Sequence, residues 1–379
     1  MQEGTPKLKH NLLKLLTGFV CLSAVLLGLL VLLSARHEAA PVITVSDTDL
    51  MANFDQYISD YLDEAEDGAR SVEKRFWLDD DAQAGPVPNP DCYGKSTDPA
   101  ELDWLLEEAS GVLKGQKTLF TTQTPIKSGS EINYYLDETI FAVTWKQILR
   151  NYVYTISEIK VSHPSQFRRH LAGGSFDSTE RYATTVMSQQ VNAVVGSSAD
   201  HFRHRKFGIV VYDGQVKQIH QPHTADVCYV DRNGDLHFSY HGQLMNLESA
   251  QKFVDERNIS FSIAFGPILV DEGKRCEPFF YPIGQIEDEY ARAALCQMDE
   301  LHYLVITANS EGWYCSSPNI HDFAAVVSTF GCQKAYTLDG GNTGTIAMNG
   351  VLMNDPPFEK ERELSDIIYF CTALPYHSS

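Results

Sequence analysis

The chain has 379 residues, of which 43% are hydrophobic, so it is long enough to form one large domain or two smaller ones around a filled core. Its formal net charge at pH 7 is −20. Because a nucleic-acid-binding surface needs positive charge, this composition argues against a nucleic-acid partner, although one local pocket can still hold a small anion.

An uncharged, mostly apolar segment, residues 15–35, follows a short basic tail, residues 1–14. About 20 such residues are enough to cross a bilayer as a helix. Lysines precede the segment and Arg36 stands nearly alone after it, so the positive-inside rule places the tail in the cytoplasm. A cleaved signal peptide is the alternative, but its apolar core is usually shorter. We expect a single-pass cell-membrane anchor with an extracytoplasmic C-terminal domain.

The next region, residues 36–117, is strongly acidic: from residue 46 to residue 110 it holds 18 acidic side chains against four basic ones. Apolar residues at helical spacing predict a helix near residues 50–61, and a second helix follows a proline-containing break. Asp98 is the expected N-cap of this second helix and Pro99 its first residue. The region therefore predicts an acidic helical stalk that spaces the C-terminal domain from the membrane.

Turn signals divide the C-terminal region, residues 118–379, into short strands and helices. Asp213-Gly214, Asn233-Gly234 and Asn349-Gly350 each separate two apolar runs, which predicts three hairpins. Antiparallel hairpins with helices between them predict an α+β domain whose mixed, largely antiparallel sheet has flanking helices.

Two amphipathic segments predict the helices of this domain. In residues 317–331, Ser317 is the expected N-cap and Gly331 the stop, and the apolar face is spaced as in a helix. In residues 246–258, Leu247 is expected to lie on the apolar face together with alanine, phenylalanine and valine.

The cysteines and histidines give no clear metal or disulfide pattern. Eight cysteines contain no CxxC pair, and the seven beyond the apolar segment allow at most three bridges; burial as small hydrophobic residues is the alternative. Asp231 begins a calcium-loop-like pattern, but the twelfth position is Gly242 rather than glutamate, which favours a turn. His201 and His204 lack an evident third ligand, so no metal site is predicted.

The sequence LDGGNTGT, residues 338–345, follows a short strand-like run. Glycines let the backbone approach a ligand, successive N–H groups can form an anion-binding nest, and threonine hydroxyls add donors. Asp339 would direct a carboxylate into the same space. The loop predicts either an anion site beside a catalytic carboxylate or a plain strand connection.

From residue 190 to residue 373 the chain resembles the phosphodiester glycosidase domain family, which includes the mannose 6-phosphate uncovering enzyme and bacterial proteins often labelled exopolysaccharide biosynthesis proteins. Arg292 matches the family's arginine before a strand, residues 338–341 match its Leu-Asp-Gly-Gly motif, and Arg362 and Asp366 match its terminal motif. The chain departs from the family at Gly196, where asparagine is expected, with Asn192 or Asp200 as candidates for a related role; the other departures are Ala293, Cys296, Asn342, Thr343 and Gly344.

The resemblance implies removal of a sugar from a sugar-1-phosphodiester, a reaction in which phosphate leaves and an oxocarbenium-like state is stabilised. It makes Asp339 the first candidate nucleophile or base, Asp200 the second, and His201 a further catalytic candidate. Substrate and phosphate binding are expected from Arg292, Gly340, Gly341, Asn342, Thr343, Thr345, Arg362 and Asp366. A surface pair of Arg362 with Asp366 or Glu361 is the structural alternative for that arginine.

We therefore expect a membrane-anchored, extracytoplasmic hydrolase similar to phosphodiester alpha-N-acetylglucosaminidase, which cleaves GlcNAc-1-phosphodiester-like linkages in exopolysaccharide or cell-envelope glycan metabolism. The expected partners are a sugar-phosphate or glycan substrate and the membrane. The alternative is a catalytically impaired carbohydrate- or sugar-phosphate-binding protein of the same fold, which the departure at Gly196 would explain. No cofactor is predicted, and the sequence leaves open whether a divalent cation assists.

Overall fold

The computed structural model describes residue 78 and residues 84–120, 131–204, 206–277, 287–309, 317–356 and 360–376. All of them belong to the second of two compact units, Arg70–Ser379. The predicted cytoplasmic tail, membrane anchor and first stalk helix lie outside the described residues. Within the described ranges, no helix has the length and apolar character that a membrane crossing needs.

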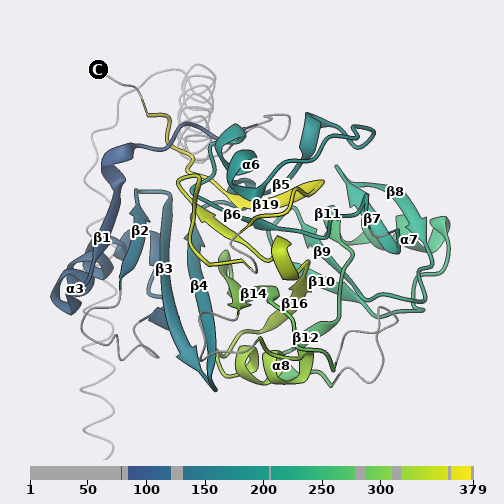
Figure 1. Cartoon of the computed structure of the whole chain (residues 1–379). Coiled ribbons are helices and arrows are strands. Elements are labelled where there is room, and N and C mark those ends of the chain that lie inside the picture. The colour runs from purple at the N-terminus through teal and green to yellow at the C-terminus, as the bar shows by residue number, and fades with distance from the viewer. Residues whose placement is uncertain are drawn as a thin grey trace, which may run out of the picture. The chain divides into compact units, whose positions relative to one another are not determined.

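A nine-stranded sheet forms the centre of the described unit, and all of its neighbouring strands pair antiparallel (Figure 1). In spatial order its strands are β1 (Tyr93–Ser96), β2 (Ile132–Leu136), β3 (Ile140–Leu149), β4 (Tyr152–Val161), β15 (His302–Asn309), β14 (Arg292–Asp299), β16 (Lys334–Leu338), β12 (Ile268–Asp271) and β13 (Lys274–Arg275). The consecutive strands β2, β3 and β4 are a meander, whereas β16 and β12 come from distant parts of the chain.

A five-stranded antiparallel sheet covers one face of the large sheet (Figure 1). Its strands in spatial order are β18 (Val351–Leu352), β17 (Ile346–Met348), β6 (Val195–Ser198), β19 (Asp366–Phe370) and β5 (Phe167–Leu171). Side chains of both sheets form one buried cluster, including Leu295 and Val305 from the large sheet and Ile346 and Phe370 from the small one. The two sheets are thus layers of one sandwich.

Two smaller sheets and a helix complete the strand-rich part. They are the sheet β10 (Leu236–Ser239), β9 (Val227–Asp231) and β11 (Ile259–Ile263), the hairpin β7 (Gly208–Tyr212) and β8 (Gln215–His220), and helix α7 (Leu247–Glu256). In α7, Ala250 and Val254 are buried, as the periodicity predicts. The prediction for Leu247 is wrong: its side chain is 60% exposed, because it is the first helical residue and lies beyond the packed stripe.

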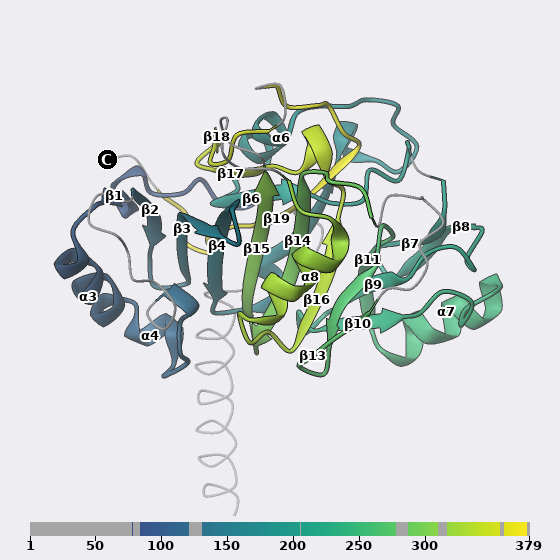
Figure 2. The same cartoon turned by 60° about the horizontal axis from the view of Figure 1, so that its bottom comes forward.

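The other face of the large sheet packs against helices. These are α8 (Ile320–Ser328), α3 (Pro99–Glu108) and α4 (Ser110–Leu113), while α6 (Thr184–Gln190) lies over the small sheet (Figure 2). The apolar face predicted for α8 is buried. Its predicted N-cap is wrong, because Asn319 rather than Ser317 accepts the N–H of Asp322 and α8 begins at Ile320.

The packed structure includes residues that precede the boundary expected at residue 118. The strand β1 pairs with β2, and Leu102 and Leu105 of α3 belong to the core cluster under the large sheet. Helix α3 begins at Pro99, as predicted. The buried carboxylate of Glu158 in β4 accepts the N–H groups of Leu119 and Phe120, at 2.7 and 2.9 Å, which attaches these two residues to β4. The last part of the predicted stalk is therefore integral to the folded domain.

The local predictions for the hairpins are confirmed. Asp213-Gly214 connects β7 to β8, Asn233-Gly234 connects β9 to β10, and Asn349-Gly350 connects β17 to β18. Asp213 and Asn349 have φ of 52°, which aspartate and asparagine tolerate better than most residues. Four short 3-10 turns, η1 (Pro90–Cys92), η2 (Pro164–Gln166), η3 (Ala172–Gly174) and η4 (Gly341–Thr343), link other elements.

Candidate active site

Asp339 lies directly after β16, with its residue 1% exposed to solvent. Its backbone N–H donates to the carbonyl of Ala199 at 2.8 Å. Its own carbonyl accepts the hydroxyl of Ser198 at 3.0 Å. These two bonds join the end of β16 to the end of β6, so the position of the Asp339 carboxylate depends on both sheets of the sandwich.

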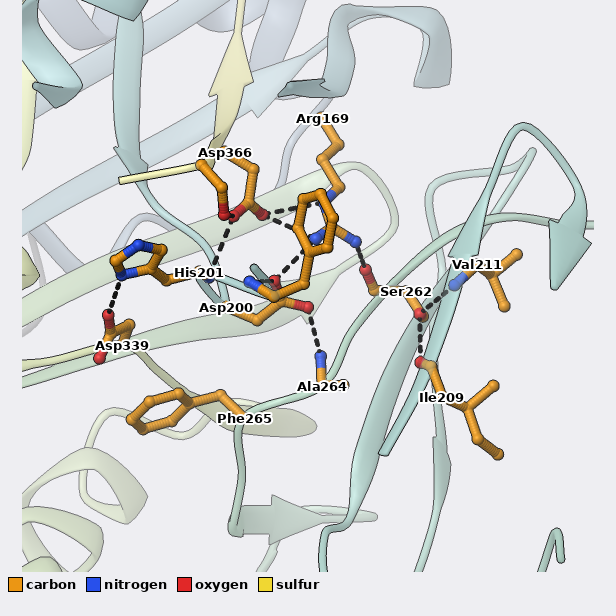
Figure 3. A network of polar contacts seen from close by, with 12 residues as sticks. Arg169, Asp200, His201, Ile209, Val211, Ser262, Ala264, Phe265, Asp339 and Asp366 are labelled. Carbon is orange, nitrogen blue, oxygen red and sulfur yellow. Dashed lines mark hydrogen bonds and ion pairs between the residues drawn. The ribbon is translucent and has the colours of Figure 1, made fainter. Parts of the chain in front are cut away.

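The Asp339 carboxylate lies between a cation and an imidazole. Its Oδ2 atom is 3.2 Å from the guanidinium of Arg362 and 3.5 Å from Nδ1 of His201 (Figure 3 shows the histidine contact). The His201 side chain is 2% exposed, whereas that of Arg362 is 45% exposed. Arg362 therefore reaches the buried carboxylate from the surface. The ion pair that it forms here is with Asp339, whereas the structural alternative was a surface pair with Asp366 or Glu361.

A buried ion cluster lies behind His201 and was not predicted from the sequence. The guanidinium of Arg169 in β5 contacts Asp200 Oδ1 at 2.8 Å and Asp366 Oδ2 at 2.7 Å (Figure 3). It also donates to the carbonyl of Ser262. All three charged side chains are 0–1% exposed, so each charge depends on its partners for stabilisation.

The buried ion cluster holds two carboxyl groups but only one guanidinium, so the composition of the cluster favours a carboxyl group that keeps its proton. Burial raises the pKa of Asp200 to about 8, against the lowering effect of Arg169, and the nearby Asp366 raises this pKa further. With Asp200 protonated near pH 7, the Arg169 and Asp366 charges balance and the cluster is neutral overall.

The ion cluster fixes the backbone that carries His201. Asp366 Oδ1 accepts the His201 N–H at 3.0 Å, and Asp200 accepts the N–H of Phe202 at 2.9 Å and that of Ala264 at 2.8 Å. His201 has φ of 53°, in the left-handed region that is uncommon for residues other than glycine. Since surrounding bonds maintain this conformation, the cluster directs the His201 ring toward Asp339.

The two ring nitrogens of His201 are available for hydrogen bonds to a bound molecule. Among the described residues, neither of its nitrogen atoms has a hydrogen-bond partner, although the ring is buried. One face of the ring stacks on His204, with centroids 5.1 Å apart. A buried imidazole whose nitrogens make no hydrogen bond to the described residues, and which lies 3.5 Å from a carboxylate, is suited to exchanging a proton with a bound molecule.

The glycines of the loop serve close packing against β14. A Cβ atom on Gly340 would lie 2.4 Å from the carbonyl oxygen of Ala291. The Gly341 N–H donates to that same oxygen at 2.8 Å, and the Thr343 N–H donates to Gly340 at 3.2 Å. The predicted anion nest is therefore not formed by the Gly341 and Thr343 donors, because both are already used within the protein.

The threonines and Asn342 of the loop also have protein partners. The Thr343 hydroxyl donates to the carbonyl of Gly340 at 2.6 Å, and the Thr345 hydroxyl contacts that of Thr184 at 2.6 Å. The carbonyl of Asn342 accepts the N–H of Arg362 at 3.1 Å. The loop thus positions the segment that carries Arg362 beside Asp339.

Arg292 faces the helix side of the large sheet. Its Nε donates to Pro318 at 3.3 Å and its Nη2 to Asp288 at 2.6 Å, both through main-chain carbonyls. Burial lowers the pKa of the guanidinium to about 10. These contacts tie the segment before α8 to the start of β14, next to the Asp339 loop in the strand register.

The segment around Gly196 gives the departure from the family motif a structural explanation. Gly196 is buried in β6, and a Cβ atom there would lie 2.1 Å from the Ser188 hydroxyl, so the glycine allows α6 to pack closely. The side-chain amide of Asn192 donates to the carbonyl of Gly85 at 2.9 Å, so this hydrogen bond points away from Asp339 to another part of the chain. Asp200 is the residue of this segment that joins the cluster.

Arg169 was missed, but the sequence contains a signal for it. In Phe167–Leu171, alternation places Phe167, Arg169 and Leu171 on one face, so an arginine lies between two apolar residues of a strand. Such an arginine has to find carboxylate partners in the core. The sequence does not say which, because Asp200 and Asp366 are 31 and 197 residues away.

No group of three or more His, Cys, Asp or Glu side chains in the described ranges is arranged to hold a metal ion. The six cysteines described are free thiols: Cys92, Cys228, Cys276, Cys296, Cys332 and Cys371. Four of them are buried, in agreement with a role as small hydrophobic residues.

The described unit is thus an α+β sandwich with a carboxylate held at the end of a central strand. Residues 188–371 match the sequence profile of the phosphodiester glycosidase (NAGPA) family. This match covers nearly the same residues as the motifs from which the resemblance to this family was predicted. A search of curated proteins found no match.

Several solved structures are similar to the chain, and three of them are described below. The zebrafish N-acetylglucosamine-1-phosphodiester alpha-N-acetylglucosaminidase (NAGPA) catalytic domain, auto-inhibited by its pro-peptide, is 16% identical, with a TM-score of 0.48 over 66% of this chain and 85% of that one. A hypothetical protein from Synechocystis is 12% identical, with a TM-score of 0.43 over 61% and 62%. A putative exported protein from Burkholderia pseudomallei is 11% identical, with a TM-score of 0.41 over 58% and 74%. The family assignment rests on the sequence match, because these likenesses are weak.

Proposed function

We propose that the chain hydrolyses sugar-1-phosphodiesters, with Asp339 as the catalytic carboxylate. The observation that carries this proposal is the position of Asp339 at the end of β16, between Arg362 and the ring of His201, whose nitrogens have no hydrogen-bond partner in the described part of the chain. The family match supports the reaction class. A phosphate is a good leaving group, so the site mainly has to bind its charge and stabilise positive charge on the sugar ring.

Asp339 acts on the anomeric carbon in one of two ways. As a nucleophile it forms a bond to this carbon while the bond to the phosphate oxygen breaks, and water later releases the sugar. As a base it takes a proton from water, whose oxygen attacks the carbon in a single step. The anomeric configuration of the first sugar released, measured by NMR, distinguishes the two: retention supports the nucleophile and inversion the base.

Arg362 is the proposed phosphate ligand. Its side chain is partly exposed and contacts Asp339 through one nitrogen, so the other N–H groups of the guanidinium can donate to a phosphate oxygen of the substrate. Because Asp339 is nearly inaccessible in this structure, substrate has to move Arg362 away from the carboxylate to reach it. Arg362 would then neutralise the negative charge of the departing phosphate rather than the charge of the Asp339 carboxylate.

The test replaces Asp339 by asparagine, which keeps the size of the side chain and removes its charge. We expect release of GlcNAc from the methyl ester of GlcNAc-1-phosphate to fall at least a thousandfold, on the order of the loss seen when catalytic groups are removed. The control is Asp213→Asn in the β7–β8 turn, where the side chain is 77% exposed. Turnover in Asp339→Asn at the wild-type rate, with an unchanged unfolding transition, would contradict the proposal.

A binding protein of the same fold is the second candidate, and one observation favours it. The loop donors that would hold a phosphate, in Gly341 and Thr343, already have protein partners, and Asp339 is paired and buried. The same assay decides between the two. Saturable binding of the methyl ester to the wild-type protein, without any release of GlcNAc, would favour the binding protein.

We further propose that residues 15–35 anchor the protein in the cell membrane, with the enzyme domain outside, where exopolysaccharide and envelope glycans are found. The support is the length, apolar character and flanking charge of this segment. Extraction of membranes at alkaline pH should leave the full chain in the pellet. Release of a shortened chain lacking these residues would instead support a cleaved signal peptide.

A further inference from the structure

Two buried cysteines lie in the cluster between the large sheet and its helices. Cys296 belongs to β14, and Cys332 lies between the end of α8 and the start of β16. They are 0% and 2% exposed, and both are members of the same buried cluster. Phe323 and Val327 of α8 belong to this cluster as well. The two thiols are therefore enclosed on the face of the sheet that α8 covers.

The register of the strands brings the two thiols together. Cys296 is opposite Ala335 of β16, and the Gln333 N–H donates to the Gln297 carbonyl at 2.9 Å. Main-chain hydrogen bonding between the two segments thus continues to the residue after Cys332. The thiols of Cys296 and Cys332 are close enough to share a side-chain hydrogen bond. Burial and this contact raise the pKa of the Cys296 thiol well above its ordinary value.

The other four described cysteines have different neighbours. The side chains that shift the pKa values of their thiols belong to aspartate, tyrosine, lysine and arginine residues. A disulfide forms without movement of the backbone only where two cysteine side chains face each other. Among the six described cysteines, Cys296 and Cys332 are therefore the pair that the fold has brought together for such a bond.

We propose that Cys296 and Cys332, which are thiols in this structure, form a disulfide in the mature protein and close the loop of residues 297–331. The inference does not depend on the reaction at Asp339. It depends on the location outside the cytoplasm proposed above, where disulfides form and persist. The bond would tie β14 to the residues before β16, the strand that ends next to Asp339.

The oxidant for this bond is a small-molecule disulfide such as oxidised glutathione. One cysteine thiolate attacks it, which releases one glutathione thiol and leaves a mixed disulfide. The second cysteine thiolate attacks the mixed disulfide, so the bond between the two cysteines forms and a second glutathione thiol leaves. Each cysteine loses one proton, and the two electrons reduce the oxidant. Because both thiols are buried once the domain is folded, we expect this exchange during folding, before α8 packs on the sheet.

The first test identifies the bond by mass spectrometry. The full chain is refolded from urea in detergent with oxidised glutathione, its free thiols are blocked with iodoacetamide, and it is digested with trypsin and Asp-N. Cleavage before Asp299 and before Asp322 places Cys296, Cys315 and Cys332 on three different peptides. We expect the peptides of Cys296 and Cys332 to be linked, with a mass two hydrogen atoms below their sum. Blocked thiols at both positions, or a link from either of them to Cys315, would overturn the proposal.

The second test compares the wild type refolded with oxidised glutathione and refolded with dithiothreitol. Closing a loop of about 35 residues should raise the midpoint of urea unfolding by about 1 M. In Cys332→Ala this difference should disappear, because one thiol of the pair is missing. Cys228→Ala is the matched control: Cys228 in β9 is also 0% exposed, and its variant should keep the difference.

Equal midpoints of the wild type in the two buffers would overturn the proposal. A difference in Cys332→Ala as large as that of the wild type would also overturn it, because another bond would then be responsible. If Cys332→Ala does not fold, the linked or blocked peptides of the wild type decide the matter.

Discussion

Replacement of Arg169 by methionine tests the buried ion cluster most directly. The arginine makes contacts of 2.7, 2.8 and 3.0 Å with Asp366 and Asp200 and also donates to the Ser262 carbonyl. Methionine fills a similar space but leaves two carboxyl groups, both 0% exposed, without their cation. Removing one partner from a buried ion pair typically costs about 3–5 kcal/mol, so we expect a loss of this size at pH 8.

The loss should depend on pH in a defined direction. Without Arg169, Asp200 loses the cation that lowers its pKa, so burial and the nearby Asp366 raise this pKa still further above its value in the unfolded chain. The folded variant then binds more protons than the unfolded one, so its stability falls as pH rises. We expect the difference from wild type to be smaller at pH 5.5 than at pH 8, because the Asp200 carboxyl group is protonated and neutral at the lower pH.

The assay is urea unfolding followed by tryptophan fluorescence at both pH values. Arg257→Met is the matched control: this arginine is 41% exposed, lies over the Phe253 ring and is 3.9 Å from Glu256. We expect the control to change stability by less than about 1 kcal/mol. A loss below 1 kcal/mol for Arg169→Met at pH 8, or the same loss at both pH values, would refute the reasoning.

Two further predictions concern single positions near the site. The raised pKa of Asp200 means that the folded protein holds a proton that the unfolded chain releases, so stability is lost as pH rises toward 8. Asp200→Asn should flatten the dependence of unfolding free energy on pH between 5 and 8 by up to about 1.4 kcal/mol per pH unit, and an unchanged slope would contradict this. Gly340→Ala should destabilise the protein by about 1–3 kcal/mol and slow turnover, because its Cβ would meet the Ala291 carbonyl at 2.4 Å. Gly111→Ala, where no atom lies within 4 Å, is the control and should be neutral or stabilising; equal effects on the two unfolding curves would show that the close approach is unimportant.

Sequence predictions were most accurate where the structure depends on neighbouring residues. The hairpins at Asp213-Gly214 and Asn349-Gly350 follow from turn residues that tolerate positive φ, and α3 begins at the predicted Pro99. The N-cap of α8 was placed two residues early because Ser317 and Asn319 are both good caps, and only packing selects between them.

The candidate site could be predicted only in part. The motif identified Asp339 and Arg362, which the fold brings to within 3.2 Å of each other. It also led to a phosphate nest in the glycine loop, but the Gly341 N–H donates to the carbonyl of Ala291, the residue before β14. Glycine is required equally for ligand binding and for close backbone packing, so composition does not distinguish these uses.

By itself, the sequence determined the match of residues 188–371 to the phosphodiester glycosidase family, the antiparallel hairpins and the identity of the carboxylate at the end of β16. Only the tertiary structure decided that Arg169 joins Asp200 and Asp366, and that this cluster holds His201 toward Asp339 (Figure 3). The reason is physical: a turn or a helix start depends on a few adjacent residues, whereas the partner of a buried charge is chosen by the packing of strands far apart in the chain.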